Sequence, residues 1–305
     1  MFHPLKCCLA VASDLLVNRL IAVVLLLIAS LGCNPLTPRA IPLSQRKPSP
    51  SLLALNTQPI ERGNPRPVLD TAGWIIGIPS KLLLWNRRVD NHRISTETEA
   101  TLQEYLVANQ LGHVKVRLNQ YRPWDDWRRL RANQDVAWPW RYSFGLVSIL
   151  GETFIPGRLF GGDHFNPYTN TIHIYSDVPA IALHEGAHAK DFARRRYPGT
   201  YAALYGLPIV PLYHESIASA DVIAYLESLG EPEMQREAYH VLYPAYGTYV
   251  GGALGFAYPP ATTPLYYGSV LGGHLAGRLQ SRTITKSTNA PVTEWQYGEL
   301  PSQSR

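Results

Sequence analysis

Cysteine is nearly absent from the chain, and this limits the kinds of site that it can build. The 305 residues include three cysteines, Cys7, Cys8 and Cys33, and residues 34–305 contain none. A domain formed by residues 34–305 therefore has neither an internal disulfide nor a cysteine-ligated metal site. Any metal site in it must use histidine and carboxylate side chains.

A strong charge of either sign is also absent. The chain has 28 Lys and Arg residues against 23 Asp and Glu residues, and it has no long basic run. Such a small excess does not indicate nucleic-acid binding, so we expect no nucleic-acid partner, while membrane headgroups remain compatible with it. The hydrophobic content of 46% suffices for an ordinary globular core and excludes a wholly disordered chain.

Residues 1–32 are expected to be an export signal or a membrane anchor. Their uncharged run LIAVVLLLIASLG, at 20–32, follows basic residues and is shorter than the roughly 20 residues of a spanning helix. It ends at Leu31-Gly32-Cys33, which resembles the lipobox of bacterial lipoproteins, with Ser30 where that pattern has leucine. The resemblance implies lipidation at Cys33. The alternative is an uncleaved anchor, and both predict an exported protein held at a membrane of the bacterial cell envelope, on a periplasmic or outer face.

The rest of the chain divides into four segments by composition. Residues 33–68 contain eight prolines, which predict an extended linker. Residues 69–237 are expected to form the catalytic domain, and residues 238–281 an uncharged, glycine-rich helical hairpin. Residues 282–305 are predicted to be a polar tail.

Local patterns predict an α+β fold. A capping pattern of Thr and Glu begins a helix over residues 96–109, and residues 124–132 form a short amphipathic helix. Alternating apolar residues predict a strand at 113–119, and residues 142–150 and 170–175 are expected to be further strands. We therefore expect a small sheet combined with helices.

The strongest chemical signal is the sequence HEGAH at residues 184–188, within a helix expected over 177–197 and capped by its first residue. Residues four apart lie on one face of a helix. His184 and His188 can therefore each direct a ring nitrogen at one Zn²⁺, and Glu185 can reach a water molecule beside it. The alternative without a metal is a helix with two solvent-facing histidines.

This HExxH spacing is that of the zincin metallopeptidases, which the chain resembles over roughly residues 140–230. In the gluzincins a second helix supplies a glutamate as the third zinc ligand. The segment PLYHESIA, at 211–218, is similar to that element, with Tyr213 in place of tryptophan and Ser216 in place of glycine. The resemblance implies an active-site helix, a second ligand-bearing helix and one zinc ion per chain, with Glu215 as the third ligand.

Other residues remain candidates for the third ligand, namely His214, Asp191 and Asp221. Residues 199–206 (GTYAALYG) resemble the GTxDxxYG element of the aspzincins, but Ala202 stands where the ligand aspartate is needed, and a methyl group cannot bind a metal. Asp191 and Asp221 are also candidates for orienting the ligand histidines by hydrogen bonds. The alternative for both is a solvent-exposed charge on a helix.

The substrate is expected to bind along residues 170–175. In zincins the edge strand near the active helix pairs with an extended peptide, so the resemblance implies binding by strand addition. Tyr175, Tyr213 and Tyr225 are candidates for stabilising the oxyanion, and the sequence gives no ground for choosing among them.

Residues 238–277 contain no Asp, Glu, Lys or Arg. Glycines at four-residue spacing predict two closely packed helices, at 245–258 and 261–277, joined by Pro259-Pro260. Both are shorter than the roughly 20 residues needed to span a bilayer. We expect them to pack on the catalytic domain, with a membrane-inserted hairpin as the alternative.

Together these patterns predict a membrane-tethered, extracytoplasmic zinc metallopeptidase that hydrolyses peptide bonds in a peptide or protein substrate. Zinc is held by His184, His188 and Glu215, with Glu185 as the general base. The alternative is a non-catalytic envelope lipoprotein with a structural or vestigial zinc site. A catalytic site keeps an open coordination position, whereas a structural site is closed by a fourth protein ligand such as His214 or Asp191.

Overall fold

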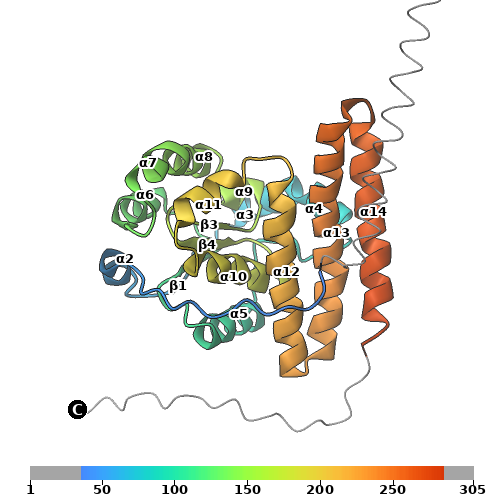
Figure 1. The fold of residues 1–305 in the computed structure, drawn as a ribbon, viewed down its shortest axis with the longest axis horizontal. Helices are drawn as coiled ribbons and strands as arrows, with labels where there is room; N and C mark the ends of the chain where they lie inside the picture. The colour runs from blue at the N-terminus through green and yellow to red at the C-terminus, as the bar shows by residue number, and fades with distance from the viewer. Residues whose placement is uncertain (1–35, 285–305) are drawn as a thin grey trace, which may run out of the picture.

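The fold consists of helices packed around a small four-stranded sheet, as seen in the computed structural model, which describes residues 36–284 (Figure 1). The expected α+β class is confirmed. The shorter helices, all but the last of which precede β3 and β4 in the chain, are α2 (Pro50–Leu55), α3 (Pro67–Ile76), α4 (Ile78–Leu83), α5 (Thr96–Ala108), α6 (Pro123–Ala132), α7 (Trp138–Trp140), α8 (Leu146–Phe154), α9 (Gly157–Phe160) and α11 (Pro198–Leu204). Three long helices and the helix of the HEGAH segment form the rest: α10 (Pro179–Ala193), α12 (Val210–Leu229), α13 (Pro232–Ala257) and α14 (Thr262–Ser281).

The sheet has the strand order β1-β2-β4-β3. Its strands are β1 (Ile60–Arg62), β2 (Lys115–Leu118), β3 (His164–Asn166) and β4 (Thr171–Ile174). The first three in this order are parallel, and β3 runs antiparallel to β4 at the border of the sheet. The predicted strand at 113–119 is thus confirmed as β2.

The expected edge strand is not at the edge. Residues 171–174 form β4, which pairs with β2 on one side and with β3 on the other. The reason is the turn before it, where Asn166 Oδ1 accepts the backbone N–H of Tyr168 and Asn170 adopts a positive φ of 53°. This turn folds β3 back onto β4, so β3 is the edge strand on this side of the sheet.

The prediction of an extended linker is wrong for residues 36–68. Leu36, Ile41 and Leu52 are buried, and the segment contributes α2 and β1. Its prolines do not prevent this, because Pro50 occupies the first position of α2, where no backbone N–H is required. The apolar residues between the prolines pack on the domain. Residues 1–35, including Cys33 and the signal, and residues 285–305 of the tail lie outside the described residues.

The strand expected at 142–150 is helical instead. Residues 141–145 form one π-helical turn (η1), and α8 follows it. The buried residues Gly145 and Ile149 are four apart, which suits a helix, and a Cβ on Gly145 would lie 2.9 Å from Leu130. A short apolar run does not distinguish the two structures by itself.

The helices predicted at 96–109 and 124–132 are confirmed as α5 and α6, and Ser95 Oγ caps α5 by accepting the N–H of Thr98. The helix predicted at 177–197 is the shorter α10. Asp177 does not cap it; its carboxylate accepts hydrogen bonds from Ser95 and Thr98 at the start of α5.

One hydrophobic core joins the sheet to the helices α5, α10, α12 and α13. It includes Leu102 and Tyr105 of α5, Leu183 of α10, Ile223 of α12 and Leu242 of α13. Most of α10 is buried between these elements. The helix with the HEGAH sequence is therefore held on several sides.

Helices α13 and α14 form the predicted hairpin, joined by a 3₁₀ turn at Pro259–Ala261. A Cβ added to Gly247, Gly251, Gly273 or Gly277 would lie 2.3–2.5 Å from backbone atoms of the other helix, so the glycines allow close contact. Both helices are longer than predicted, and α13 contains Pro244. Its first half shares the core with α10 and α12, so the hairpin packs on the rest of the domain. None of the helices within residues 36–284 has the length and hydropathy needed to cross a bilayer.

Candidate metal centre and cavity

Helix α10 places His184 and His188 side by side. Their Nε2 atoms lie 3.0 Å apart, and the two rings are nearly perpendicular, at 85°. The helix can approach α5 closely because Gly186 lies against the ring of Tyr105, where a Cβ would be 2.9 Å from ring atoms. This contact fixes the position of the helix that carries both histidines.

Helix α12 brings Glu215 to these histidines. Its Oε2 lies 2.9 Å from His184 Nε2, and its Oε1 lies 3.4 Å from His188 Nε2. All three side chains are largely shielded from solvent. The structure thus brings together the three residues expected from the sequence as metal ligands, from two different helices.

The carboxylate of this cluster stays charged although it is buried. Burial acts to raise the pKa of Glu215, but the neighbouring His188 and His184 outweigh it and hold that pKa well below its usual range. Burial acts to lower the pKa of His188, and the Glu215 carboxylate outweighs it, raising the pKa to about 9. A buried carboxylate is therefore kept in its charged form, which is the form that binds a metal.

The three residues fit a zinc ion. One ligand atom from each lies within 4.8 Å of the others. A tetrahedral zinc with Zn–N distances of about 2.0–2.1 Å has ligand atoms roughly 3.3 Å apart, close to the separations of 2.9–3.4 Å here. Two imidazole lone pairs 3.0 Å apart repel unless a proton or a cation lies between them. Two imidazoles and one carboxylate are also a donor set of catalytic zinc sites.

Two hydrogen bonds that the sequence analysis did not anticipate position the ligands. Tyr205 donates its hydroxyl to Glu215 Oε1 at 2.7 Å, and Ser219 Oγ lies 3.4 Å from His184 Nδ1. Ser219 follows Glu215 by four residues on α12, so helical spacing could have indicated it. Tyr205 lies in the segment after α10, and its contact with Glu215 depends on tertiary packing.

The two predicted orienting carboxylates have other partners. Asp191 accepts hydrogen bonds from Arg194, Arg195 and Tyr201. Neither it nor Asp221 has a hydrogen bond to His184 or His188 within the described part of the chain. Both are buried, so the alternative of a solvent-exposed helix charge is wrong as well.

Asp221 joins three segments. Its carboxylate accepts hydrogen bonds from Lys190 at 2.7 Å, from the Tyr105 hydroxyl and from the backbone N–H of Ile41. Asp221 and Lys190 are 0% and 5% exposed, respectively. The contacts of Asp221 therefore link α12 to α10, to α5 and to the N-terminal segment that was expected to be a linker.

His214 is close to the cluster but outside it. Its ring stacks on Tyr201, with centroids 4.1 Å apart, and neither ring nitrogen has a hydrogen-bond partner among residues 36–284. Burial lowers its pKa to about 4, assisted by the charge on His188, so the ring is neutral near pH 7. His214 therefore packs against aromatic side chains beside the three candidate ligands.

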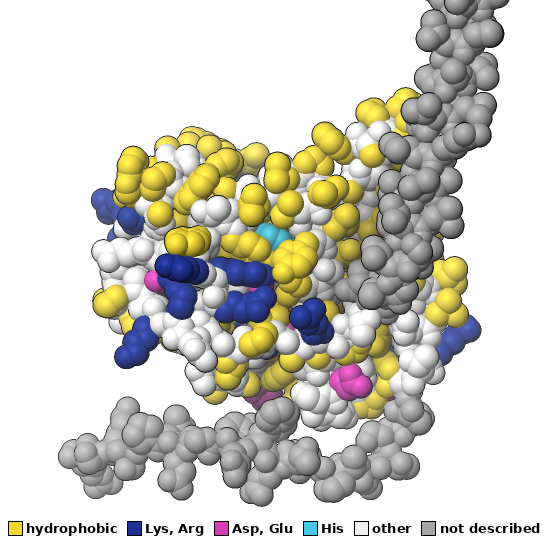
Figure 2. Space-filling view, in the orientation of Figure 1, with side chains coloured by type: hydrophobic (Ala, Val, Ile, Leu, Met, Phe, Trp, Pro, Cys, Tyr) yellow, Lys and Arg dark blue, Asp and Glu magenta, His cyan; other side chains and the backbone are white. Residues whose placement is uncertain are grey.

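A cavity of about 440 Å³ opens beside the three candidate ligands. Glu185 lines it, as do Tyr205, Tyr246 and Tyr249, whereas the tyrosines considered from the sequence, Tyr175, Tyr213 and Tyr225, do not. Residues of the edge strand β3 border it too. In the space-filling view a histidine side chain is visible in a hollow flanked by hydrophobic side chains (Figure 2).

Comparison of the chain with protein-family models, with curated proteins and with solved structures finds no match. The case for a function therefore depends on the geometry and chemistry of the site.

Proposed function

We propose that the protein is a zinc-dependent peptidase whose zinc is held by His184, His188 and Glu215. The observation that carries this proposal is the convergence of these three side chains beside a cavity that Glu185 also lines. When bound there, zinc would polarise a carbonyl group and lower the pKa of water. The remaining steps belong to side chains of the chain itself.

Glu185 is the general base in this proposal. Its carboxylate accepts the proton of the water that attacks the scissile carbonyl and then delivers it to the departing amine. Glu185 follows His184 on α10 and lines the cavity beside the three ligands. Tyr205 holds Glu215 in place through its hydroxyl hydrogen bond.

The free edge of β3 is the proposed binding site for the substrate backbone. Strand β3 pairs only with β4 within the described sheet, and its residues His164 and Phe165 border the cavity. An extended peptide can add to such an edge by main-chain hydrogen bonds. The free edge of β3 supports a peptide or protein substrate. The proposed pairing strand is therefore β3, whereas the sequence had indicated residues 170–175, which form β4.

A structural zinc site remains the alternative, and two observations weigh against it. Asp191, one candidate for a fourth ligand, is engaged by two arginines and a tyrosine. His214, the other candidate, does not belong to the group of ligand atoms that lie within 4.8 Å of one another. With the cavity beside them, the three ligands leave room for an open coordination position.

Attachment to a membrane is part of the proposal and depends on the run at 20–32 and on Cys33, both outside the described residues. Hydrophobic side chains gather at the end of the molecule where α7, α8 and the tip of the α13–α14 hairpin lie (Figures 1 and 2). Phe154 is the last residue of α8, Phe256 lies at the end of α13, and they are 77% and 70% exposed, respectively. Such a surface is compatible with a position near a bilayer.

Removal and return of the metal tests the proposed function. We expect the purified full-length chain, in detergent, to cleave members of a fluorogenic peptide library. Treatment with a zinc chelator should abolish cleavage, and added Zn²⁺ should restore it. The variant His188→Ala should stay inactive after zinc is added, whereas the control His240→Ala should behave as wild type. Cleavage that survives loss of zinc, or bound zinc without any cleavage, contradicts the proposal.

A further inference from the structure

A second group of two histidines and one glutamate lies at the hairpin formed by β3 and β4. His164 of β3 and His173 of β4 are direct cross-strand partners, and their rings stack with centroids 4.7 Å apart. Glu152 of α8 reaches both, with Oε1 3.0 Å from His164 Nε2 and Oε2 4.0 Å from His173 Nε2. One ligand atom from each residue lies within 4.8 Å of the others.

Two atoms at the centre of this group have no hydrogen-bond partner within residues 36–284. They are Nε2 of His173, a residue only 4% exposed, and Oε2 of Glu152. An unpaired buried polar atom is destabilising, so native proteins rarely leave two of them facing each other. A cation between them would satisfy both.

The surroundings already orient these side chains as metal ligands. His164 Nδ1 lies 2.9 Å from the carbonyl oxygen of Gly162, so Nδ1–H donates there and Nε2 is directed at Glu152 Oε1, 3.0 Å away. The Asn166 side-chain amide donates to Glu152 Oε1 at 2.7 Å.

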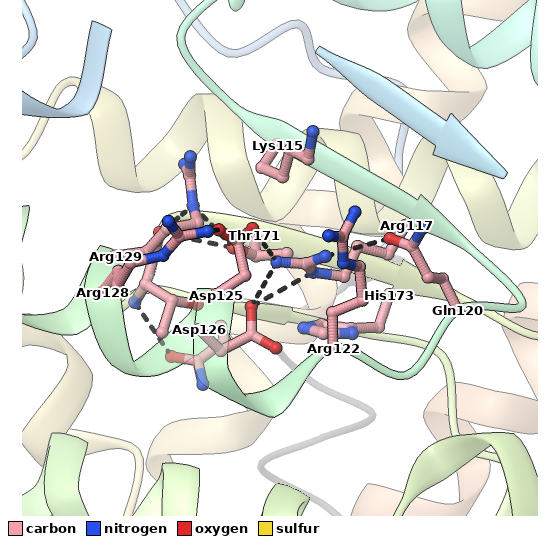
Figure 3. A network of polar contacts seen from close by, with 12 residues as sticks. Lys115, Arg117, Gln120, Arg122, Asp125, Asp126, Arg128, Arg129, Thr171 and His173 are labelled. Atoms are coloured by element: carbon pink, nitrogen blue, oxygen red, sulfur yellow. Dashed lines mark hydrogen bonds and ion pairs between the residues drawn. The ribbon is translucent and has the colours of Figure 1, made fainter. Parts of the chain in front are cut away.

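The nearby positive charges are committed elsewhere. Figure 3 shows His173 beside the fully buried Arg117, whose guanidinium binds Asp125 at 2.6 Å and Asp126 at 2.9 Å. Within the described chain, no lysine or arginine forms an ion pair with Glu152. Its carboxylate pairs with His164, from which a metal ion would displace the proton on binding.

We propose that Glu152, His164 and His173 form a second site for a divalent metal ion, most suitably zinc. Two imidazoles and a carboxylate suit zinc better than magnesium or calcium, which prefer oxygen ligands. A cavity of about 210 Å³ adjoins the three residues and has room for water as a further ligand. The ion would tie α8 to the hairpin whose outer strand, β3, borders the larger cavity.

The inference does not depend on the peptidase proposal, and zinc counting separates the two. The measurement is the zinc content of the purified full-length chain after dialysis, with Zn²⁺ itself as the probe. We expect two zinc ions per wild-type chain and one in each of His173→Leu, Glu152→Gln and His188→Ala. The double variant His188→Ala with His173→Leu should bind none.

Two controls keep the result interpretable. His92 is another buried histidine with an unpaired Nε2, and it lies outside both groups, so His92→Gln should retain two zinc ions. Circular dichroism melts in chelator establish that each variant folds. Leucine removes the unpaired nitrogen of His173, so without a metal role His173→Leu should be neutral or stabilising.

Each outcome decides the inference. If the wild type binds one zinc that is lost in His188→Ala and retained in His173→Leu, the second site is overturned. If the single zinc is instead lost in His173→Leu and retained in His188→Ala, the second site stands and the peptidase proposal fails. Added zinc should raise the melting temperature of His188→Ala but not that of the double variant.

Discussion

The hydroxyl of Tyr205 lies 2.7 Å from Oε1 of Glu215 and donates a hydrogen bond to it. Burial and the Glu215 carboxylate both raise the pKa of Tyr205, so the hydroxyl keeps its proton. Tyr205 is the next-to-last residue of the segment GTYAALYG, which has alanine at the position that would carry a ligand aspartate. The segment therefore contributes no metal ligand of its own. It contributes the hydroxyl of Tyr205, which holds Glu215 of α12 in position.

Replacing Tyr205 with phenylalanine should weaken zinc binding at the first site without unfolding the protein. Loss of a group that orients a ligand typically lowers metal affinity about 10–100-fold. Competition with a chelating dye measures this change. Tyr213→Phe is the matched control, because Tyr213 is 52% exposed and does not line the cavity beside the ligands. Equal affinities in the two variants would show that the Tyr205 hydroxyl has no such role.

Two adjacent glycines of α14 should respond oppositely to alanine. A Cβ on Gly273 would lie 2.5 Å from the carbonyl oxygen of Tyr243 on α13, so Gly273→Ala should destabilise the protein by about 1–3 kcal/mol. Gly272 has open space around it, and Gly272→Ala should stabilise by about 0.5–1 kcal/mol through helix propensity. Urea denaturation compares the two. Similar values for both would contradict the close packing of the hairpin.

Loss of the Asp221 carboxylate should be costly for stability but not for zinc binding. Asp221→Ala leaves the buried Lys190 ammonium without its partner, which typically costs about 3–5 kcal/mol. The control is Glu233→Ala, which removes an exposed pair with Arg236 and should cost less than about 1 kcal/mol. Chemical denaturation gives the stabilities. Zinc loss from folded Asp221→Ala would instead restore its expected role in orienting a ligand.

The contribution of Asp177 should depend on pH. Burial acts to raise the pKa of Asp177, but hydrogen bonds from Ser95 and Thr98 outweigh it, and the pKa is lowered from its usual 3.8. A carboxyl group whose pKa is lower in the folded state stabilises the fold above its unfolded pKa, about 3.9, and this contribution disappears as pH falls through the folded pKa. Wild type should therefore exceed Asp177→Asn in stability at neutral pH, and the gap should shrink in acid. A gap that widens toward low pH would contradict the assigned contacts.

Elements with strong local signals were predictable from the sequence. The caps of α5, the periodicity of α6 and the glycines of the hairpin each act within a few residues, so their patterns are visible without the fold. The helical form of residues 141–154 was not, because a short apolar run fits either structure and its neighbours decide. The proline content of residues 36–68 was misleading for a similar reason. Burial of Leu36, Ile41 and Leu52 depends on surfaces supplied by distant segments.

In the site, too, residues with a local sequence signal were predictable and residues brought together by packing were not. His184, Glu185 and His188 follow from spacing on one helix, and Glu215 followed from a resemblance to a second helix. The contact of Tyr205 with Glu215 depends on how α11 and α12 pack. Strand pairing and the placement of α8 bring Glu152, His164 and His173 together, so no spacing in the sequence predicts that they form a group.

We propose that Glu185 acts as the base at a zinc held by His184, His188 and Glu215. The most direct test measures zinc content and peptide cleavage on the same preparation of Glu185→Gln and wild type. Glutamine keeps the size of the side chain but cannot accept the proton, so we predict unchanged zinc content and loss of cleavage by at least about 100-fold. Glu185→Gln that cleaves peptides at the wild-type rate while retaining its zinc would contradict the account.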